Sequence, residues 1–397
     1  MRTSSLSTFL QGVRAMQRVQ GELSNTQLQV STGRRILKAS DDPLGAAAAV
    51  GLRESLAQLQ QFDRNANTAR ARLEYEETTL SSVTDVIQRV RELTLRALNG
   101  SETPESRNQI AIEMSERVTE LVELANQKDA AGSYLFAGGA DGTEPVSVTN
   151  GGILYNGDDG QRLVQIGESR QIYDGDAGSR VFFNIRDGNG IFRVDAGASN
   201  TGSAYINSYE LLDGSAYDLS SYRIRFLGPN SYEILDGGNN VFATGTWDSG
   251  ESISFRGVSV TVDGVPAAGD EFSLKPSRFQ SVFESITKMA EFLADKPSGA
   301  PELADMRTTL NNGLLELDLA LDRITGVRSE VGIRLNAIDT QVDSNGGAAL
   351  LSQQAISEIE DLDYAEAISR LTQQTAILEA SQQSFVLTQR LSLFQFL

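Results

Sequence analysis

Paired carboxylates are the residues of this sequence best suited to acid–base chemistry, because cleavage of a glycosidic bond uses two carboxyl groups. Two such pairs occur, Asp41-Asp42 and Glu76-Glu77. Asp42 stands directly before Pro43, which is typical of a helix N-cap followed by the first helical residue. We interpret Glu76-Glu77 as the solvated face of a helix. Separate segments supply no visible constellation of acid and base, so we expect no enzymatic activity.

Acidic loops rich in glycine are the second candidate sites, in this case for calcium. They are Asn156–Gly160, Tyr173–Asp176 and Asp187–Gly190. None matches the twelve-residue calcium loop that ends in a bidentate glutamate, whereas Asp-Gly and Asn-Gly are common in tight turns. Gly138-Gly139 also lacks the strand–loop–helix context of a phosphate-binding loop. The sequence therefore predicts no metal and no cofactor.

The composition removes further kinds of chemistry. The 397 residues include no histidine and no cysteine, which excludes a Ser-His-Asp triad, disulfides and thiolate metal sites. The net charge of −19 disfavours nucleic acid and anionic membranes as partners. The first residues contain no apolar signal region, and no stretch is apolar enough to span a bilayer. The lack of cysteine gives weak support for a protein that functions outside the cell.

Proline and tyrosine divide the chain into helical ends and a β-rich middle. All 8 prolines lie between Pro43 and Pro301, so both ends are free to form long helices. Most of the 10 tyrosines lie between Tyr134 and Tyr232. Because aromatic residues favour strands, the middle of the chain is expected to form a sheet.

Each end of the chain carries a weak heptad seam, with apolar residues at alternating steps of three and four. The N-terminal seam, ended by Gly33, consists of Leu6, Phe9, Val13, Met16, Gln20, Leu23, Gln27 and Val30. The C-terminal seam consists of Tyr364, Ile368, Leu371, Thr375, Leu378, Gln382 and Phe385. Glutamine and threonine weaken both seams, so one helix pair alone would be marginal. Two interpretations remain: a coiled coil within the chain, or packing between many copies.

Capping residues and breakers predict the remaining helices. They span about Asp42 to Leu98, Thr103 to Gly132, Phe279 to Asp295 and Pro301 to Asp343. Asn345-Gly346-Gly347 is expected to break the helix, so that Ala348–Leu397 would form a final rod of roughly 75 Å.

The segment from about Gly138 to Ser277 has the two-residue period of strands. Examples are Arg180–Ile185, Tyr222–Phe226 and Val258–Val262. The expected hairpin turns are Asp187-Gly188, Asp213-Gly214, Asp236-Gly237 and Asp263-Gly264. This segment is predicted to be an antiparallel β domain inserted into a helical one.

The predicted fold class is therefore α+β and multidomain, with long terminal helices, a helical bundle and an inserted antiparallel β domain. The predicted domains are residues 1–40 with 348–397 as a terminal coiled coil, 41–137 with 278–347 as a helical bundle, and 138–277 as the β domain.

Several motifs near the N-terminus resemble those of bacterial flagellins and their relatives. Val30–Ile36, Ser40–Pro43 and the alanine-rich Gly45–Val50 are similar to the N-terminal signature of that family. Ile87–Thr94 and Asn99-Gly100 resemble the next characteristic stretch.

Motifs further along the chain are similar to the hook-associated branch of the same family. They are Ser133–Gly138, Tyr155–Asp158, Gly257–Val262 with Gly264 and Pro266, and Gly269–Phe272. The ending Ser392–Leu397 departs from the usual flagellin ending and is closer to this branch.

This resemblance implies a subunit of the hook–filament junction of the bacterial flagellum. The terminal helices would form the wall of an inner tube, the adjoining helices an outer tube, and the β domain would project outward. The chain would be exported unfolded through the flagellar type III apparatus to the extracellular flagellum, with a chaperone holding its C-terminal region. The implied partners are hook-associated protein 1, flagellin and further copies of this chain in a ring. The surface of flagellin that host receptors recognise maps to Gln88–Thr94.

We therefore expect a structural adaptor that works by packing. The subunit-packing seam is predicted to consist of Leu6, Phe9, Val13, Met16, Leu23, Val30, Ile368, Leu371, Leu378, Phe385, Phe394 and Leu397. The closest alternative is a flagellin that forms the bulk filament. A second alternative is a secreted β module that binds carbohydrate or calcium on a coiled-coil stalk.

Overall fold

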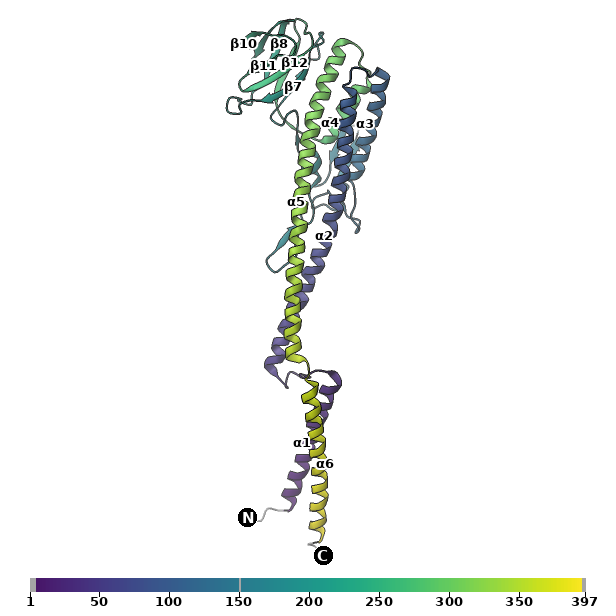
Figure 1. The fold of residues 1–397 in the computed structure, drawn as a ribbon, viewed down its shortest axis with the longest axis vertical. Coiled ribbons are helices and arrows are strands. Elements are labelled where there is room, and N and C mark those ends of the chain that lie inside the picture. Colours follow the sequence, from purple (N-terminus) through teal and green to yellow (C-terminus); the bar gives the residue numbers. More distant parts are fainter. Residues whose placement is uncertain (1–4, 150, 395–397) are drawn as a thin grey trace. The chain divides into compact units, whose positions relative to one another are not determined.

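Helices occupy both ends of the part of the chain that this computed structural model describes, residues 5–149 and 151–394 (Figure 1). The helices are α1 Ser5–Thr32, α2 Pro43–Ala97, α3 Pro104–Ala125, α4 Val282–Ala294, α5 Ala300–Glu360 and α6 Tyr364–Phe394. Antiparallel strands fill the middle, which confirms the predicted class of terminal helices with an inserted β domain. The chain divides into two compact units, Met1–Arg64 with Thr340–Leu397, and Asn65–Asp339.

Capping side chains begin α2, α3 and α4. Asp42 Oδ1 accepts a hydrogen bond from the backbone N–H of Gly45 at 2.9 Å, so the predicted N-cap is confirmed. The Thr103 hydroxyl likewise accepts from the Ser106 N–H at 3.2 Å. α4 begins three residues later than predicted, because Phe279-Gln280 forms strand β14 and Ser281 caps the helix. The helix after Thr103 ends at Ala125, not at Gly132.

α5 departs most from the predicted helix boundaries, because Asn345-Gly346-Gly347 does not break it. Asn345 is buried, and its amide donates to Asp63 Oδ1 at 3.1 Å and accepts from Gln341 at 2.9 Å. These contacts offset a glycine helix penalty of about 1 kcal/mol per residue. The break lies instead at Asp361–Asp363, where Asp363 Oδ1 accepts from the Ala365 N–H at 2.9 Å. α6 therefore has 31 residues, about 46 Å in length, and the predicted 75 Å rod is wrong.

The strands of the middle segment form a core of two sheets, preceded by two short hairpins, while the last strand, β14, pairs with β5 from before the core. Their bounds are β1 Val146–Thr149, β2 Gly152–Tyr155, β3 Leu163–Gln165, β4 Gln171–Tyr173, β5 Ile185–Arg186, β6 Phe192–Ala196, β7 Tyr205–Leu211, β8 Tyr222–Gly228, β9 Ser231–Leu235, β10 Val241–Thr246, β11 Ser252–Phe255, β12 Val258–Asp263, β13 Glu271–Pro276 and β14 Phe279–Gln280. A five-stranded sheet has the order β10-β9-β8-β13-β6, and a three-stranded sheet the order β11-β12-β7. All of these pairings are antiparallel.

One apolar core joins the two sheets, since residues of both belong to it. Phe192, Ile224, Phe226 and Phe272 come from the larger sheet, and all four are fully buried. Val260 comes from the smaller sheet and is fully buried as well. The predicted strands Tyr222–Phe226 and Val258–Val262 are confirmed as β8 and β12. Arg180–Ile185 was wrongly predicted as a strand. Residues Ser179–Phe183 form a π-helical turn that inserts Val181 and Phe182 into the helical core.

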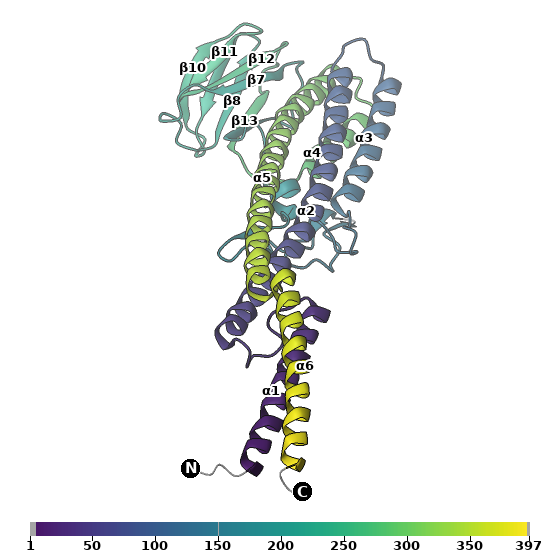
Figure 2. The same cartoon turned by 60° about the horizontal axis from the view of Figure 1, so that its bottom comes forward.

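In the Asn65–Asp339 unit, α3 and α4 lie side by side with the parts of α2 and α5 that belong to the unit (Figures 1 and 2). Leu80 and Ile87 of α2, Met114 of α3, Ile286 of α4 and Leu317 of α5 are buried. None of the described helices is both long and apolar enough to cross a bilayer.

α5 also fastens the β-sandwich, because its side chains bind the backbone of β6 and β7. The Thr308 hydroxyl accepts from the Ile206 N–H at 3.1 Å, and Asn311 donates to the Ile206 carbonyl at 2.9 Å. Asn312 donates to the Val194 carbonyl at 2.8 Å and accepts from the Tyr209 hydroxyl at 2.8 Å. β6 and β7 are the edge strands of the two sheets, so these bonds cover edges that would otherwise be open.

Candidate assembly surface

α1 and α6 lie side by side and run antiparallel in both views (Figures 1 and 2). Among their side chains that the structure describes, only Thr26 and Ala367 are buried, at 3% and 0% exposure. At their far end the rings of Phe9 and Phe385 pack at 5.2 Å between centroids. A Cβ on Gly12 would lie 3.5 Å from the Phe385 ring, so glycine brings the two helices close there. The pair thus touches along one narrow strip.

The predicted seam residues stand at the margin of this strip and none of those described is fully buried. Val13, Met16, Leu23, Val30, Leu371, Leu378 and Phe385 are half-buried. Phe9 and Ile368 remain 40% and 52% exposed. The side chains of Leu6 and Phe394, and the whole of Leu397, lie outside the described part of the chain.

The contacted strip is rotated slightly from the predicted seams. Gln20 and Gln27 are exposed, and Val19 and Thr26 take the inward positions beside them. On α6 the inward position belongs to Ala367, which leaves the neighbouring Ile368 in solvent. The apolar stripe of α6 is therefore wider than the part that α1 covers.

Further large apolar side chains of the pair are open to solvent. Their exposed fractions run from 43% to 60%, and they are Leu10, Leu28, Ile377, Val386 and Leu387. Isolated exposed leucines are ordinary, but many of them on one thin helix pair indicate a surface that binds protein.

Gly33 joins the end of α1 to the corner between α5 and α6. Its φ of +71° is the left-handed conformation that ends a helix. The Gly33 carbonyl accepts from the Leu362 N–H at 3.0 Å, and the Arg35 N–H donates to the Glu360 carbonyl at 2.6 Å. The Arg35 guanidinium adds a hydrogen bond to the Ile359 carbonyl at 2.7 Å. The motif Val30–Ile36 therefore connects the end of α1 to a segment that lies more than 300 residues later in the sequence.

The Asp41-Asp42 pair is structural, as predicted. Asp41 Oδ2 accepts from the Leu37 and Lys38 N–H groups at 3.1 and 2.9 Å, and Asp42 caps α2. A Cβ on Gly45 would lie 2.5 Å from Asp42 Oδ2. The acidic pair and the following glycine thus form one tight turn.

The Glu76-Glu77 pair contradicts its interpretation as a solvated helix face. Glu76 is 1% exposed, and neither of its carboxylate oxygens has a hydrogen-bond partner among the described residues. Burial above all, and then the charge of Asp176, raise the pKa of Glu76 well above 4.5. Glu77 is half-buried and accepts from Arg328 at 2.7 Å. The sequence pattern could not reveal this, because the residues that bury Glu76 come from distant segments.

An ionic cluster surrounds Glu76 and ties three elements of the Asn65–Asp339 unit together. Arg334 of α5 pairs with Asp176 at 2.8 Å, and Arg180 reaches the same carboxylate at 3.0 Å. Arg72 of α2 pairs with Asp129 at 2.5 Å. Because these groups are mutually neutralised and largely buried, the cluster fixes the loop after β4 to the two long helices.

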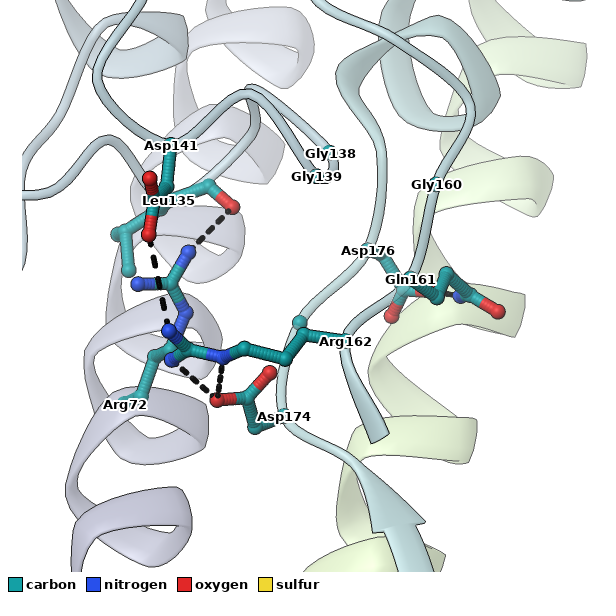
Figure 3. A pocket seen from close by; sticks show the side chains of 11 residues that line it. Arg72, Leu135, Gly138, Gly139, Asp141, Gly160, Gln161, Arg162, Asp174 and Asp176 are labelled. Atoms are coloured by element: carbon teal, nitrogen blue, oxygen red, sulfur yellow. Dashed lines mark hydrogen bonds and ion pairs between the residues drawn. The ribbon is translucent and has the colours of Figure 1, made fainter. Parts of the chain in front are cut away.

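A small cavity beside this cluster has room for water and little else (Figure 3). Its volume is about 30 Å³, whereas one water needs about 10–15 Å³. Arg162 spans its mouth between Asp174 at 2.5 Å and Asp141 at 3.6 Å, and Arg72 donates to the Leu135 carbonyl (Figure 3). This geometry suits a structural network and leaves no space for a substrate.

Two of the three acidic-glycine loops, Asn156–Gly160 and Asp187–Gly190, form bends or turns, whereas the aspartates of Tyr173–Asp176 are buried and pair with arginines. Asp158 Oδ1 accepts from the N–H groups of Gly139 and Gly160 at 2.6 and 2.8 Å. Gly188 and Gly190 have φ values of +60° and +86°. Within residues 5–149 and 151–394, no three acidic side chains are grouped as metal ligands would be.

The stretch Gln88–Thr94 is a helix surface with one buried stripe. Val90, Leu93 and Thr94 are buried, while Arg89 is exposed and bonds to Glu113 at 2.8 Å.

Comparisons with known proteins agree with this architecture. The profile described as bacterial flagellin N-terminal helical region matches residues 4–141, and the bacterial flagellin C-terminal helical region matches 314–397. Flagellar hook-associated protein 1, D2-like domain, matches 196–276. The crystal structure of FlgL from Xanthomonas campestris is 32% identical, and the match covers 77% of this chain and 99% of that one, with a TM-score of 0.74. The chain belongs to the flagellar hook-associated protein 3 family.

Other family members support this assignment along the whole chain. Flagellar hook-associated protein 3 of Escherichia coli is 27% identical over 396 residues, covering 100% of this chain and 99% of the relative. The crystal structure of HAP-3 from Legionella pneumophila is 29% identical, with coverages of 78% and 98% and a TM-score of 0.75. The expected class, a structural protein of the bacterial flagellum, is confirmed.

Proposed function

We propose that this chain is an adaptor subunit that joins the hook side of the flagellum to the flagellin filament by packing, without catalysis. A second Legionella pneumophila structure, described as the flagellar junction protein FlgL, is 28% identical with a TM-score of 0.72. Membership of the same family makes the junction the natural place for this chain.

One observation carries the proposal: the terminal pair of this chain cannot bury its own apolar side chains. Only Thr26 and Ala367 are buried among the described side chains of α1 and α6, while residues such as Ile368 and Leu387 remain more than half exposed. Burial of apolar surface contributes about 25 cal/mol per Å². A subunit that packs on neighbouring copies gains this stabilisation, which the solitary chain forgoes.

The proposed packing seam consists of Leu6, Phe9, Val13, Met16, Leu23, Val30, Ile368, Leu371, Leu378, Phe385, Phe394 and Leu397. Residues 1–40 with 348–397 would form the inner tube, 41–137 with 278–347 the outer tube, and 138–277 the outward β domain. The proposed partners are hook-associated protein 1, flagellin and a ring of further copies. An export chaperone would hold the C-terminal region until the flagellar type III apparatus delivers the chain.

The main alternative is a flagellin that builds the bulk filament, since both flagellin profiles match the chain. The match to the D2-like domain of hook-associated protein 1 at residues 196–276 favours the junction role over this alternative. The alternative of a β module that binds calcium or carbohydrate is tested by calorimetry with both ligands.

Electron microscopy of flagella that carry labelled protein tests the proposal. We expect a narrow band of label between hook and filament. Deletion of the gene is expected to leave hooks without filaments, with flagellin released into the medium. Label along the whole filament would contradict the proposal and support a flagellin.

A further inference from the structure

An open cavity of about 420 Å³ lies where β6 and β13 end beside β14 and α4. Four of its ten lining residues are basic, although the chain as a whole has a net charge of −19. The basic residues are Arg193, Lys275, Arg278 and Lys288. Three more lining residues, Asp187, Asp195 and Glu284, are acidic, so the basic residues outnumber the acidic ones by one and the unpaired cations among them decide what the cavity can bind.

Two of these cations are neutralised within the chain and two are not. Arg193 pairs with Asp195 at 2.6 Å and with Glu316 at 2.5 Å, and Lys288 pairs with Glu284 at 3.1 Å. In contrast, the exposed side chains of Lys275 and Arg278 form no ion pair or hydrogen bond with any residue that the structure describes. The carboxylate nearest in sequence, that of Asp187, accepts from the backbone N–H of Arg278 at 2.7 Å.

Lys275 lies in the sheet beside an arginine that is already paired. Lys275 of β13 lies directly opposite Arg193 of β6 in the antiparallel register. Arg193 engages the carboxylates of both Asp195 and Glu316, and neither of these carboxylates forms an ion pair with Lys275. An anion that contacts Lys275 and Arg278 would supply the counter-charge that both side chains lack.

An exposed aromatic residue completes the cavity. Phe279 is 62% exposed, and the guanidinium of Arg186 stacks over its ring at 4.7 Å. Arg186 forms no ion pair with the described residues either, although it does not itself line the cavity. Aromatic and arginine side chains are enriched where proteins bind one another.

We propose that this cavity binds a short acidic peptide segment of a neighbouring copy of this chain, whose carboxylates bridge Lys275 and Arg278. The choice of a second copy follows from charge complementarity: copies with 53 acidic and 34 basic residues repel one another, so a close contact needs local cations. The volume lies within the roughly 300–1,000 Å³ of ordinary ligand cavities, which suits a few side chains. The identity of the occupant rests on the proposed assembly, while the anion site itself does not.

Calorimetric titration of the full chain with the peptide acetyl-Asp-Glu-Asp-Glu-amide tests the site. We expect saturable binding at low salt that weakens as ionic strength rises. The double variant Lys275→Gln/Arg278→Gln should lose at least tenfold in affinity. The control Lys38→Gln/Arg170→Gln removes the same charge from exposed positions outside the cavity and should stay within about twofold. Equal affinity of both variants, or no binding to the unaltered chain, would overturn the site.

Carbodiimide cross-linking of intact flagella tests the occupant. The reagent activates a carboxyl group and joins it to a lysine amine as an amide, while the carboxyl oxygen leaves with the reagent as a urea. The chain contains few lysines, so a cross-linked dimer is readily assigned to one of them. The dimer should disappear with Lys275→Gln and persist with Lys38→Gln. A dimer that persists in Lys275→Gln would overturn the neighbouring copy as occupant, even if the peptide binds. If the junction role alone is wrong, label is found elsewhere while peptide binding to the isolated chain remains.

Discussion

The β-sandwich buries its large apolar side chains, whereas the terminal helix pair leaves many of its own exposed. In the sandwich, Phe192, Ile224, Phe226 and Phe272 are fully buried between two sheets. In the pair, Phe9 is the only described phenylalanine of α1, and it stays 40% exposed against Phe385. Two layers of strands close around their core, whereas two helices share only one strip. A single chain therefore encloses the apolar core of the sandwich completely, whereas it leaves part of the apolar surface of the helix pair exposed.

Leu371→Asp is expected to have the largest effect, because it should block assembly through the helix pair and leave the sandwich intact. Leu371 is half-buried at the strip between α1 and α6, so a carboxylate there enters the packing surface. We expect loss of assembled filaments in a strain that carries only this variant, with a β-sandwich that melts as before. Electron microscopy and thermal denaturation measure the two results.

Gln373→Asp is the matched control for that substitution. Gln373 is exposed on the same helix, two residues away, and receives the same charge. Most filaments should form. Normal filaments with Leu371→Asp would break the account, as would an equal defect in both variants.

Phe226→Ala is expected to give the next largest effect, now on stability. Phe226 packs against Trp247 at 5.1 Å and Phe272 at 6.0 Å, so its loss leaves a cavity worth about 3–5 kcal/mol. Phe385→Ala, in the half-open pair, should cost much less in the isolated chain. Chemical denaturation followed by tryptophan fluorescence reads the sandwich, where Trp247 lies, and circular dichroism at helical wavelengths reads the pair that contains Phe385. Similar losses in the free energy of unfolding for both variants would contradict the difference in packing between the two regions.

Gly33→Ala should destabilise the corner that organises the pair by about 1–2 kcal/mol. Its φ of +71° disfavours an L-residue, and the new Cβ would lie 2.9 Å from the Tyr364 hydroxyl oxygen. Gly21→Ala provides the control, because Gly21 lies within α1 with nothing within 4 Å of a Cβ. That substitution should instead stabilise the helix by up to about 1 kcal/mol. Thermal melts followed by circular dichroism distinguish the two variants. An unchanged stability of Gly33→Ala would contradict the role of this corner in organising the pair.

The smallest expected effect concerns the pH dependence of the bundle. Between pH 4.5 and the raised pKa of Glu76, the folded chain holds a proton that the unfolded chain has released. Stability therefore falls as the pH rises through this window. Glu76→Gln removes the titrating group, so its melting temperature should exceed that of the unaltered chain at pH 8 and converge with it near pH 4. Glu77→Gln, which loses the pair with Arg328, should show no such gain.

Local patterns were sufficient to predict most of the fold. Capping residues such as Asp42 and Thr103 act within one turn of their own helix, so sequence alone identified these helix starts. The strands Tyr222–Phe226 and Val258–Val262 were likewise evident from their alternation, because each turns one face to a single core.

Many of the wrong predictions involve contacts between distant segments. The hairpins expected at Asp187-Gly188, Asp213-Gly214 and Asp263-Gly264 are wrong, because the strands on either side of each turn pair with other strands, whereas Asp236-Gly237 does join the paired strands β9 and β10. Asn345 keeps α5 helical through a bond to Asp63, and Glu76 is buried by residues that include Asp176. The seam was predicted within one residue of its true position on α6, but only the partner helix decides that Ala367 and not Ile368 points inward. Periodicity identifies an apolar stripe without showing which part of it a partner covers.

Hydrogen–deuterium exchange of a verified monomer, compared with assembled flagella, tests the central claim most directly. Amides of residues 5–30 and of α6 should exchange fast in the monomer, while those of β8 and β12 stay protected. Assembly should then slow exchange in the terminal helices by orders of magnitude. Slow exchange across residues 5–30 in the monomer, unchanged on assembly, would contradict the claim that this pair is completed by its neighbours.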